Sequence, residues 1–283
     1  MEMRIIESCA ECLYDKQAHR CSDPSYLTRV KEIIDNRKPE DTSPYLVYQF
    51  NLEYEKRFGK KSSYSEVKKK YNDLLLSMEQ SFRAKIEAAE DPLLQALLYA
   101  RIGNYIDVAA MNVIKEETLM ELFENVQNRP QEEEVIRHFV ADCEKAKRLL
   151  LISDNCGEIV LDKLFIEQLR KRFPDLSVSV LVRGEEVLND ATVEDAKTVG
   201  LDRVANVISN GLPIAGTVYT MLPDEAKQAI DQADVILAKG QGNYESLSRQ
   251  GRHIYFSFLC KCELFTNRFS APLLTGIFCE ERE

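Results

Sequence analysis

The sequence predicts an α/β protein, a three-layer sandwich with a mostly parallel sheet, preceded by an all-helical N-terminal region. Two patterns carry this prediction. Before about residue 146, apolar residues recur at three- and four-residue steps, as on the buried face of amphipathic helices. After it, short β-branched apolar runs alternate with helical segments, which is typical of a parallel sheet with crossover helices. We therefore expect a helical region over 1–145, packing on the core, and an α/β domain over 146–283.

Helix signals divide the N-terminal region. Ser43-Pro44 resembles an N-cap with a first-turn proline, Ser63-x-x-Glu66 has the spacing of a capping box, and Asp91-Pro92 caps the next apolar run. The predicted helices span 25–36, 45–58, 63–89, 93–102, 117–126 and 131–145.

The second half contains five candidate strands. They span 148–153, 177–182, 204–209, 233–238 and 253–259, and predicted helices at 158–172, 193–199 and 224–232 lie between them. Several strands are continuous apolar runs, as expected when helices cover both faces of a sheet.

Composition excludes several classes of protein. The chain has 283 residues, 45% of them hydrophobic, and 37 Lys and Arg against 47 Asp and Glu give a net charge of −10. The apolar fraction is too high for a disordered chain, and the acidic balance argues against a nucleic-acid partner. No apolar run is long enough to cross a membrane, and the N-terminus lacks a signal-peptide core, so we expect a cytoplasmic protein.

Polar residues follow each predicted strand. In chain order they are Asp154-Asn155-Cys156-Gly157-Glu158; Arg183-Gly184 with Asn189-Asp190-Ala191-Thr192; Ser209-Asn210-Gly211; Lys239-Gly240-Gln241-Gly242-Asn243-Tyr244-Glu245; and Cys260-Lys261-Cys262. Ligands bind at the carboxyl ends of parallel strands, so these segments are expected to converge. Carboxylate and amide oxygens suit Mg²⁺ or Mn²⁺, while lysines and glycine N–H groups suit a phosphate. The pattern predicts a metal-assisted phosphoryl site, although each residue alone could also be a helix cap, a turn or a solvated strand end.

The same motifs resemble a known family. Leu151 to Asp162 is similar to the signature of the damage-control phosphatases, formerly domain of unknown function 89. The resemblance continues through the later strand ends and includes Gly103-Asn104-Tyr105-Ile106-Asp107 and, as in the mainly prokaryotic branch, Cys9-Ala10-Glu11-Cys12. It therefore extends from about Ser8 to the C-terminus, with several motifs in the family's order.

The resemblance implies a metal-dependent phosphatase of small phosphorylated metabolites, including sugar phosphates and damaged phosphometabolites, whose α/β domain binds the metal. By position, Asp154, Asn155 and Asp190 would hold a divalent ion (Mn²⁺, Co²⁺, Ni²⁺ or Mg²⁺), and Lys261 would bind phosphate. The nucleophile would be a metal-activated water or the carboxylate of Asp154. The residues expected to contact substrate are Asn104, Asp107, Glu158, Arg183, Asn189, Lys239, Gly240, Asn243 and Tyr244.

Two other functions stay open at this stage. One is an S-adenosylmethionine-dependent methyltransferase, although Gly157 stands alone where a Gly-x-Gly would be expected. The other is a non-catalytic module that binds a metal or a metabolite on the same fold. Separately, Cys9-x-x-Cys12 is either part of a structural zinc site or a pair of reduced packing cysteines.

Overall fold

The structure is a computed structural model that describes residues 4–59, 63–106, 116–124, 126 and 130–282. Its centre is a six-stranded sheet in the order β3-β2-β1-β4-β5-β6. The strands are β1 (Arg148–Ile152), β2 (Ser177–Val182), β3 (Asn206–Ser209), β4 (Val235–Lys239), β5 (Ile254–Leu259) and β6 (Gly276–Glu281). All neighbouring pairs are parallel except β5–β6, which is antiparallel. The predicted fold class is confirmed.

Twelve α-helices are described around this sheet. They are α1 (Glu7–Arg20), α2 (Pro24–Asp35), α3 (Ser43–Phe58), α4 (Ser65–Ala88), α5 (Pro92–Ile102), α7 (Glu116–Glu124), α8 (Glu133–Lys145), α9 (Glu158–Arg172), α10 (Val193–Thr198), α11 (Asp224–Gln232), α12 (Gln241–Leu247) and α13 (Glu263–Phe269). As expected, Asp91 accepts hydrogen bonds from the backbone N–H groups of Leu93 and Leu94 at the start of α5.

The structure corrects two cap predictions. The hydroxyl of Thr42, not that of Ser43, accepts the N-cap hydrogen bond of α3. Ser63 does not form a capping box, because α4 begins at Ser65; the Ser63 hydroxyl accepts from the Ser65 N–H and donates to Glu186 in the loop after β2. A capping-box motif shows that a local cap is possible. It does not show a distant partner, here Glu186, that binds the same side chain.

Four elements were missing from the sequence prediction: α1, α12, α13 and β6. The two late helices are only seven residues long, and α1 carries few apolar residues, so none shows a clear helical stripe. Strand β6 pairs only with β5, and its apolar start gives way to charged residues. Its pairing with an edge strand is a tertiary effect that the local sequence does not encode.

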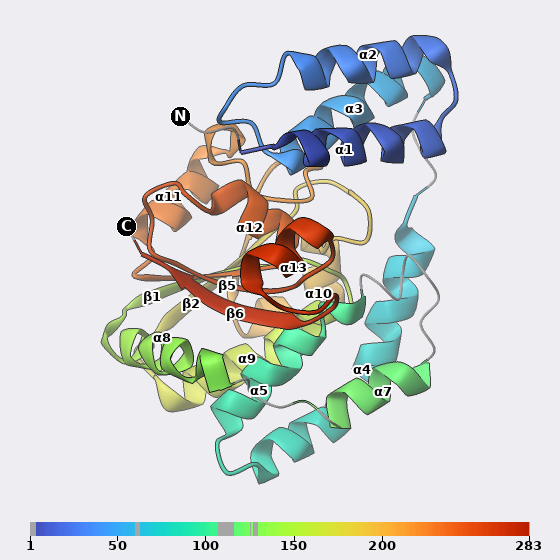
Figure 1. Cartoon of the computed structure of the whole chain (residues 1–283). Coiled ribbons are helices and arrows are strands. Elements are labelled where there is room, and N and C mark those ends of the chain that lie inside the picture. The colour runs from blue at the N-terminus through green and yellow to red at the C-terminus, as the bar shows by residue number, and fades with distance from the viewer. Residues whose placement is uncertain (1–3, 60–62, 107–115, 125, 127–129, 283) are drawn as a thin grey trace.

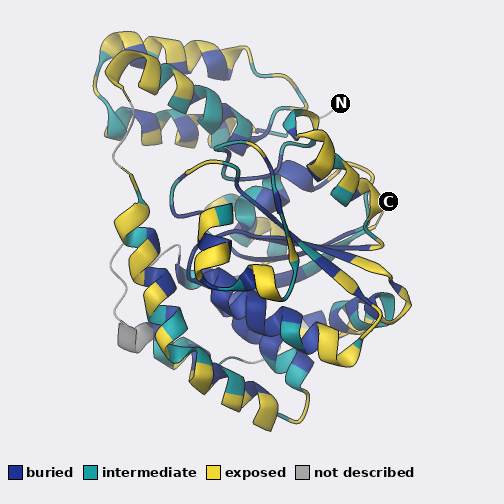
Figure 2. Cartoon of the chain, turned by 180° about the vertical axis from the view of Figure 1, so that it is seen from behind, coloured by how far each residue is buried: buried dark blue, intermediate teal, exposed yellow. Residues whose placement is uncertain are grey.

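The helices form two layers that enclose the sheet (Figure 1). One core lies between the sheet and a layer that includes α4, α5, α8 and α9, and the other lies between the sheet and α11, α12 and α13. Helix α9 is almost entirely buried, whereas the outer helices have exposed faces (Figure 2). Because the first core contains side chains from both sides of residue 146, helices α4, α5, α7 and α8 share one interior with the sheet. The domain division at 146 stays a prediction.

Helices α1, α2 and α3 pack around a smaller core of their own, at one end of the molecule (Figure 1). Arg4 connects this unit to the sheet region, because its guanidinium donates to the backbone carbonyls of Glu245, Ser246 and Ser248 at the end of α12. No described helix is both long and apolar enough to cross a membrane.

Candidate active site

Asp154 and Asp190 lie together at the carboxyl ends of neighbouring strands. Asp154 follows β1, Asp190 lies in the loop after β2, and an antiparallel bridge between Asn155 and Asp190 joins the two loops outside the sheet. The backbone N–H of Ala191 donates to the carbonyl of Asp154 at 2.8 Å, and that of Cys156 donates to the carbonyl of Asn189 at the same distance. The two loops are therefore held as one unit, as the sequence predicted.

Neither carboxylate acts as a helix cap. The N-cap position of α9 is Gly157, while α10 is capped by a box in which Thr192 and Asp195 bond to each other. The side chains of Asp154 and Asp190 are nevertheless 12% and 5% exposed. A charged side chain is stable in a buried position only when it has strong partners. Helix capping does not supply such partners for these two carboxylates, so other groups must.

Arg183 is one of those partners, and its side chain is fully buried at the end of β2. Its Nε donates to Asp190 Oδ2 at 2.7 Å, and its Nη1 donates to the carbonyl of Gly216 at 2.9 Å. Nη2 lies 3.7 Å from Asp154 Oδ1 and has no hydrogen-bond partner among the described residues. One guanidinium thus lies between both carboxylates and presents an unused N–H donor beside Asp154.

Amide side chains orient Asp154. Its Oδ2 accepts hydrogen bonds from the amides of Asn104 (2.7 Å) and Asn155 (2.8 Å). Asn104 comes from the end of α5, and its own oxygen accepts from the backbone N–H of Leu259 in β5 at 3.4 Å. Asn189 donates to Asn155 Oδ1 at 3.0 Å. The site therefore receives side chains from both halves of the chain.

Gly240 provides the space that the Asp154 carboxylate occupies. Its φ is +83°, and an added Cβ would lie 2.1 Å from Asp154 Oδ2. Glycine is required here both because other residues rarely adopt this φ and because any side chain would displace the carboxylate.

A buried ion-pair cluster lies directly behind these residues. Lys239, at the end of β4, donates to Glu158 Oε1 (2.6 Å), Asp162 Oδ1 (2.7 Å) and the carbonyl of Ala100 (2.9 Å). The other oxygen of Glu158 accepts from Asn104 and Asn155, so the cluster is continuous with the site. All three ammonium donors are used, and Lys239 and Glu158 are buried. As placed, these two residues support Asn104 and Asn155, and neither has an exposed group to offer to a substrate.

Charges in this cluster are strongly coupled. Burial raises the pKa of Asp162 to about 7, even though the Lys239 ammonium beside it lowers that pKa. Burial lowers the pKa of Lys239, but the two carboxylates outweigh this effect and raise it above its usual value. Together with the two site aspartates, four carboxylates therefore surround two cations, Lys239 and Arg183. The carboxyl groups outnumber the cations even though Asp162 is only partly ionised near neutral pH, and this balance favours a bound cation.

The remaining expected residues are placed as follows. Asn243 uses its whole amide internally, because it donates to the carbonyls of Ser153 and Lys239 and accepts from Thr217 and Arg183. The ring of Tyr244 packs among four phenylalanines and borders a separate cavity of about 120 Å³, and burial raises its pKa to about 12. Lys261 is half-buried just after β5, where its backbone N–H donates to Gln241. Asp107 lies outside the described residues.

The sequence interpretation missed the contribution of α4. Asn72 accepts a hydrogen bond from the Gly157 N–H at 2.6 Å and donates to Asp195, while Lys68 forms a buried ion pair with Asp195. It also missed Asp162. The available signal was polarity within an apolar helix, four residues after Glu158, but the partner Lys239 is 77 residues away in sequence.

The donor chemistry of the site fits a divalent cation. Asp154, Asp190 and Asn155 present carboxylate and amide oxygens, which suit Mg²⁺ and Mn²⁺, and the surrounding charge is negative. The N-terminal cysteines do not offer a comparable set. Among the described residues, no three His, Cys, Asp or Glu ligand atoms that include Cys9, Cys12 or Cys21 lie within 4.8 Å of one another.

Comparisons with known proteins find similar sequences and a solved structure of the same fold. A "Damage-control phosphatase" of Archaeoglobus fulgidus is 28% identical over 279 residues, covering 92% of this chain and 93% of the relative. A damage-control phosphatase of Pyrococcus horikoshii is 31% identical over 224 residues, covering 78% of this chain and 75% of the relative. The crystal structure of a domain-of-unknown-function-89 protein from the same organism has a TM-score of 0.79 at 24% identity, covering 98% of this chain and 99% of that one, which shows the shared fold.

The family model described as "Damage-control phosphatase ARMT1-like domain" matches residues 3–273, nearly the whole chain. The chain belongs to the damage-control phosphatase ARMT1-like family.

Proposed function

We propose that this chain is a metal-dependent phosphomonoester hydrolase that acts on small phosphorylated metabolites, namely sugar phosphates or damaged phosphometabolites. The names of its relatives support a phosphatase role. The more specific proposal, metal-dependent hydrolysis of small phosphorylated metabolites, rests on one observation. Two buried carboxylates, Asp154 and Asp190, lie on either side of the Arg183 guanidinium. Buried charges of this kind are expensive to maintain, which is why we assign them a function.

In this proposal each residue of the site has a role. Asp154, Asn155 and Asp190 would hold Mn²⁺, Co²⁺, Ni²⁺ or Mg²⁺, which when bound would neutralise phosphate charge and activate an attacking oxygen. Asn104 and Asn155 fix Oδ2 of Asp154, and Arg183 fixes Asp190. Lys261 binds a phosphate oxygen. Because phosphoryl transfer depends mainly on positioning and charge stabilisation, these groups are sufficient.

Removing the metal tests the proposal. Dialysis against EDTA should abolish hydrolysis of p-nitrophenyl phosphate and of a panel of sugar phosphates, and adding Mn²⁺, Co²⁺, Ni²⁺ or Mg²⁺ should restore it. The measurement is phosphate release, with circular dichroism to show that the chelated protein stays folded. Equal turnover with and without EDTA would contradict the metal requirement.

The same assay separates the other candidate functions. Binding of S-adenosylmethionine without phosphate release would indicate a methyltransferase. Binding of a metal and a sugar phosphate without release would indicate a non-catalytic module.

The contact between Gly240 and Asp154 makes a second prediction. Gly240→Ala should lower turnover by about 100-fold, because the added methyl group displaces a carboxylate that must be held within a fraction of an ångström. The matched control is Gly251→Ala, which imposes a similar backbone strain (φ +62°) but has no atom within 4 Å of the new Cβ. Similar turnover in the two variants would show that the position of the Asp154 carboxylate does not matter.

A further inference from the structure

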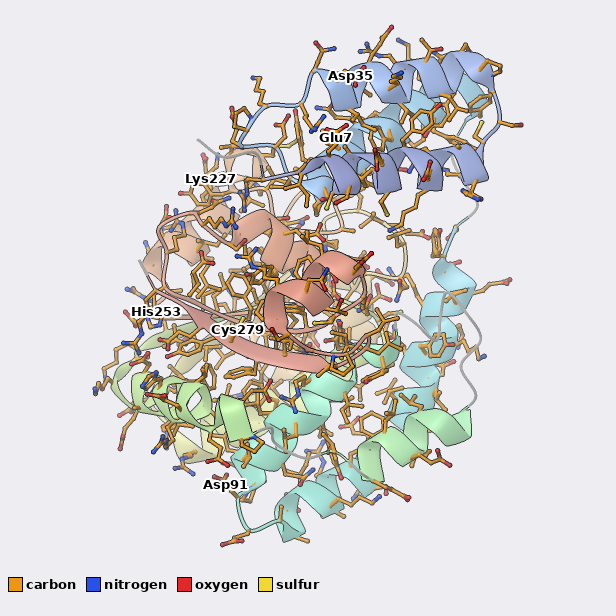
Figure 3. The ribbon with its side chains drawn as sticks, viewed as in Figure 1. Glu7, Asp35, Asp91, Lys227, His253 and Cys279 are labelled. Carbon is orange, nitrogen blue, oxygen red and sulfur yellow. The ribbon has the colours of Figure 1, made fainter. Side chains whose placement is uncertain are left out.

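A second group of metal-ligand side chains lies at the opposite edge of the sheet. Asp142 is on α8, His253 immediately precedes β5, and Glu280 lies near the end of β6. His253 lies at the edge of the sheet in Figure 3. Lys261 follows the other end of β5, a six-residue strand about 20 Å long, so this group is remote from the candidate active site.

The ligand atoms of these three residues already converge. One atom from each lies within 4.8 Å of the others. His253 Nε2 lies 2.6 Å from Glu280 Oε1 and 3.8 Å from Asp142 Oδ2. A tetrahedral ion with bonds of about 2.1 Å needs ligand atoms about 3.4 Å apart. Shifts of less than about 1 Å would therefore bring the three atoms to coordination distance.

Neighbouring side chains orient these ligands. His138 Nδ1 lies 3.0 Å from the second oxygen of Glu280, and the Tyr255 hydroxyl donates to Asp142 Oδ2 at 2.6 Å. Hydrogen bonds of this kind to ligating carboxylates are typical of metal sites.

We propose that Asp142, His253 and Glu280 form a second divalent-metal site, which takes Zn²⁺ and joins α8 to the β5–β6 edge of the sheet. His138 is a positioning residue that holds Glu280. The one-imidazole, two-carboxylate set suits a borderline ion such as Zn²⁺ or Co²⁺ rather than Ca²⁺ or Mg²⁺, which prefer oxygen ligands alone.

The exposure of this site, and the ion pairs that its side chains form, both allow Zn²⁺ to bind. The side chains of His253 and Asp142 are 37% and 31% exposed, which leaves a path for the ion and room for water as a further ligand. Arg282 contacts the same oxygen of Glu280, but its side chain is 59% exposed and lies at the end of β6. Binding of Zn²⁺ would displace this guanidinium to solvent.

The test is to count Zn²⁺ equivalents bound at equilibrium dialysis in four proteins: the unaltered chain, His253→Asn, Asp154→Asn and His19→Asn. His253→Asn should bind one equivalent fewer than the unaltered chain. His19 is an exposed histidine on α1 and serves as the matched control, so its variant should bind the full number. Asp142→Asn, on a different element, should repeat the loss if His253→Asn proves unstable.

Imidazole ¹⁵N spectra provide a second readout that does not depend on activity. The chain has three histidines, so single substitutions assign every signal. Zn²⁺ should shift the Nε2 signal of His253 in both the unaltered chain and Asp154→Asn, and it should leave His19 unchanged. Phosphatase activity should not change in His253→Asn, which separates this site from the proposed active site.

Two results would overturn the proposal. One is an equal number of Zn²⁺ equivalents in the unaltered chain, His253→Asn and Asp142→Asn. The other is a His253 signal that does not respond to Zn²⁺ in excess. Loss of Zn²⁺ in Asp154→Asn alone would place all the bound metal at the active site, and it too would contradict a second site.

Discussion

Asp154→Asn should reduce metal-restored phosphate release by about 100-fold or more, because the substitution removes one of the two negative charges that would hold the metal in the proposed site. The amide is nearly isosteric, and its oxygen can still accept from Asn104 and Asn155, which now bond to Oδ2. The fold should therefore be retained, with an unchanged circular dichroism spectrum and thermal midpoint. The measurement is turnover of p-nitrophenyl phosphate with Mn²⁺ restored.

Two companion variants make this prediction specific. Asp190→Asn should show a loss of similar size, because it removes the other carboxylate at Arg183. Asp202→Asn changes an exposed aspartate just before β3 and should retain full activity. Turnover in Asp154→Asn equal to that in Asp202→Asn would remove Asp154 from the proposed chemistry.

Lys239→Met should destabilise the fold by about 3–5 kcal/mol, because it leaves the carboxylates of Glu158 and Asp162 buried without their cation. Lys171→Met is the matched control. Lys171 forms an ion pair with Glu87 in which both side chains are more than half exposed, so its loss should cost less than about 1 kcal/mol. Urea unfolding measures both differences, and equal effects would contradict the role of the buried cluster.

The effect of Lys239→Met should also depend on pH. Burial already raises the pKa of Asp162 to about 7, and removing the neighbouring ammonium should raise it further. A carboxyl group whose folded pKa is above its unfolded value binds more protons in the folded state, so stability falls as pH rises between the two values. The variant should therefore be less destabilised at about pH 5.5 than at about pH 8. An effect that is independent of pH would mean that Lys239 acts through packing alone.

The sequence predicted the parts of the site that depend on strand order. The carboxyl ends of parallel strands share one edge, so placing Asp154 after β1 and Asp190 after β2 was enough to bring them together. The sequence could not show which way the side chains point. Lys239 and Asn243 follow the correct strand, yet both are used inside the protein, where they hold Glu158 and the backbone at the ends of β1 and β4.

The parts of the fold and of the site that the sequence did not predict depend on contacts between segments far apart in the chain. Asn72 of α4 bonds to the backbone of Gly157, 85 residues away, and no local pattern in α4 encodes that contact. Strand β6 likewise depends on its neighbour β5 rather than on its own apolar pattern. The missed α1 has few apolar residues because it contributes to a small core formed with only two other helices.

The hydrogen bonds of Asn104 cross the boundary at residue 146, where the sequence pattern changes from helices alone to alternating strands and helices. The segment after this boundary contains both Asp154 and Asp190. Its acidic residues alone therefore suggest that it holds the whole candidate site. Yet Asn104, one of the two amides that hold Asp154, and Asn72, which accepts from the Gly157 N–H, both lie in the helical segment before the boundary. The helical segment thus holds part of the candidate site in place, so a substitution at Asn72 or Asn104 would disturb residues that lie beyond the boundary.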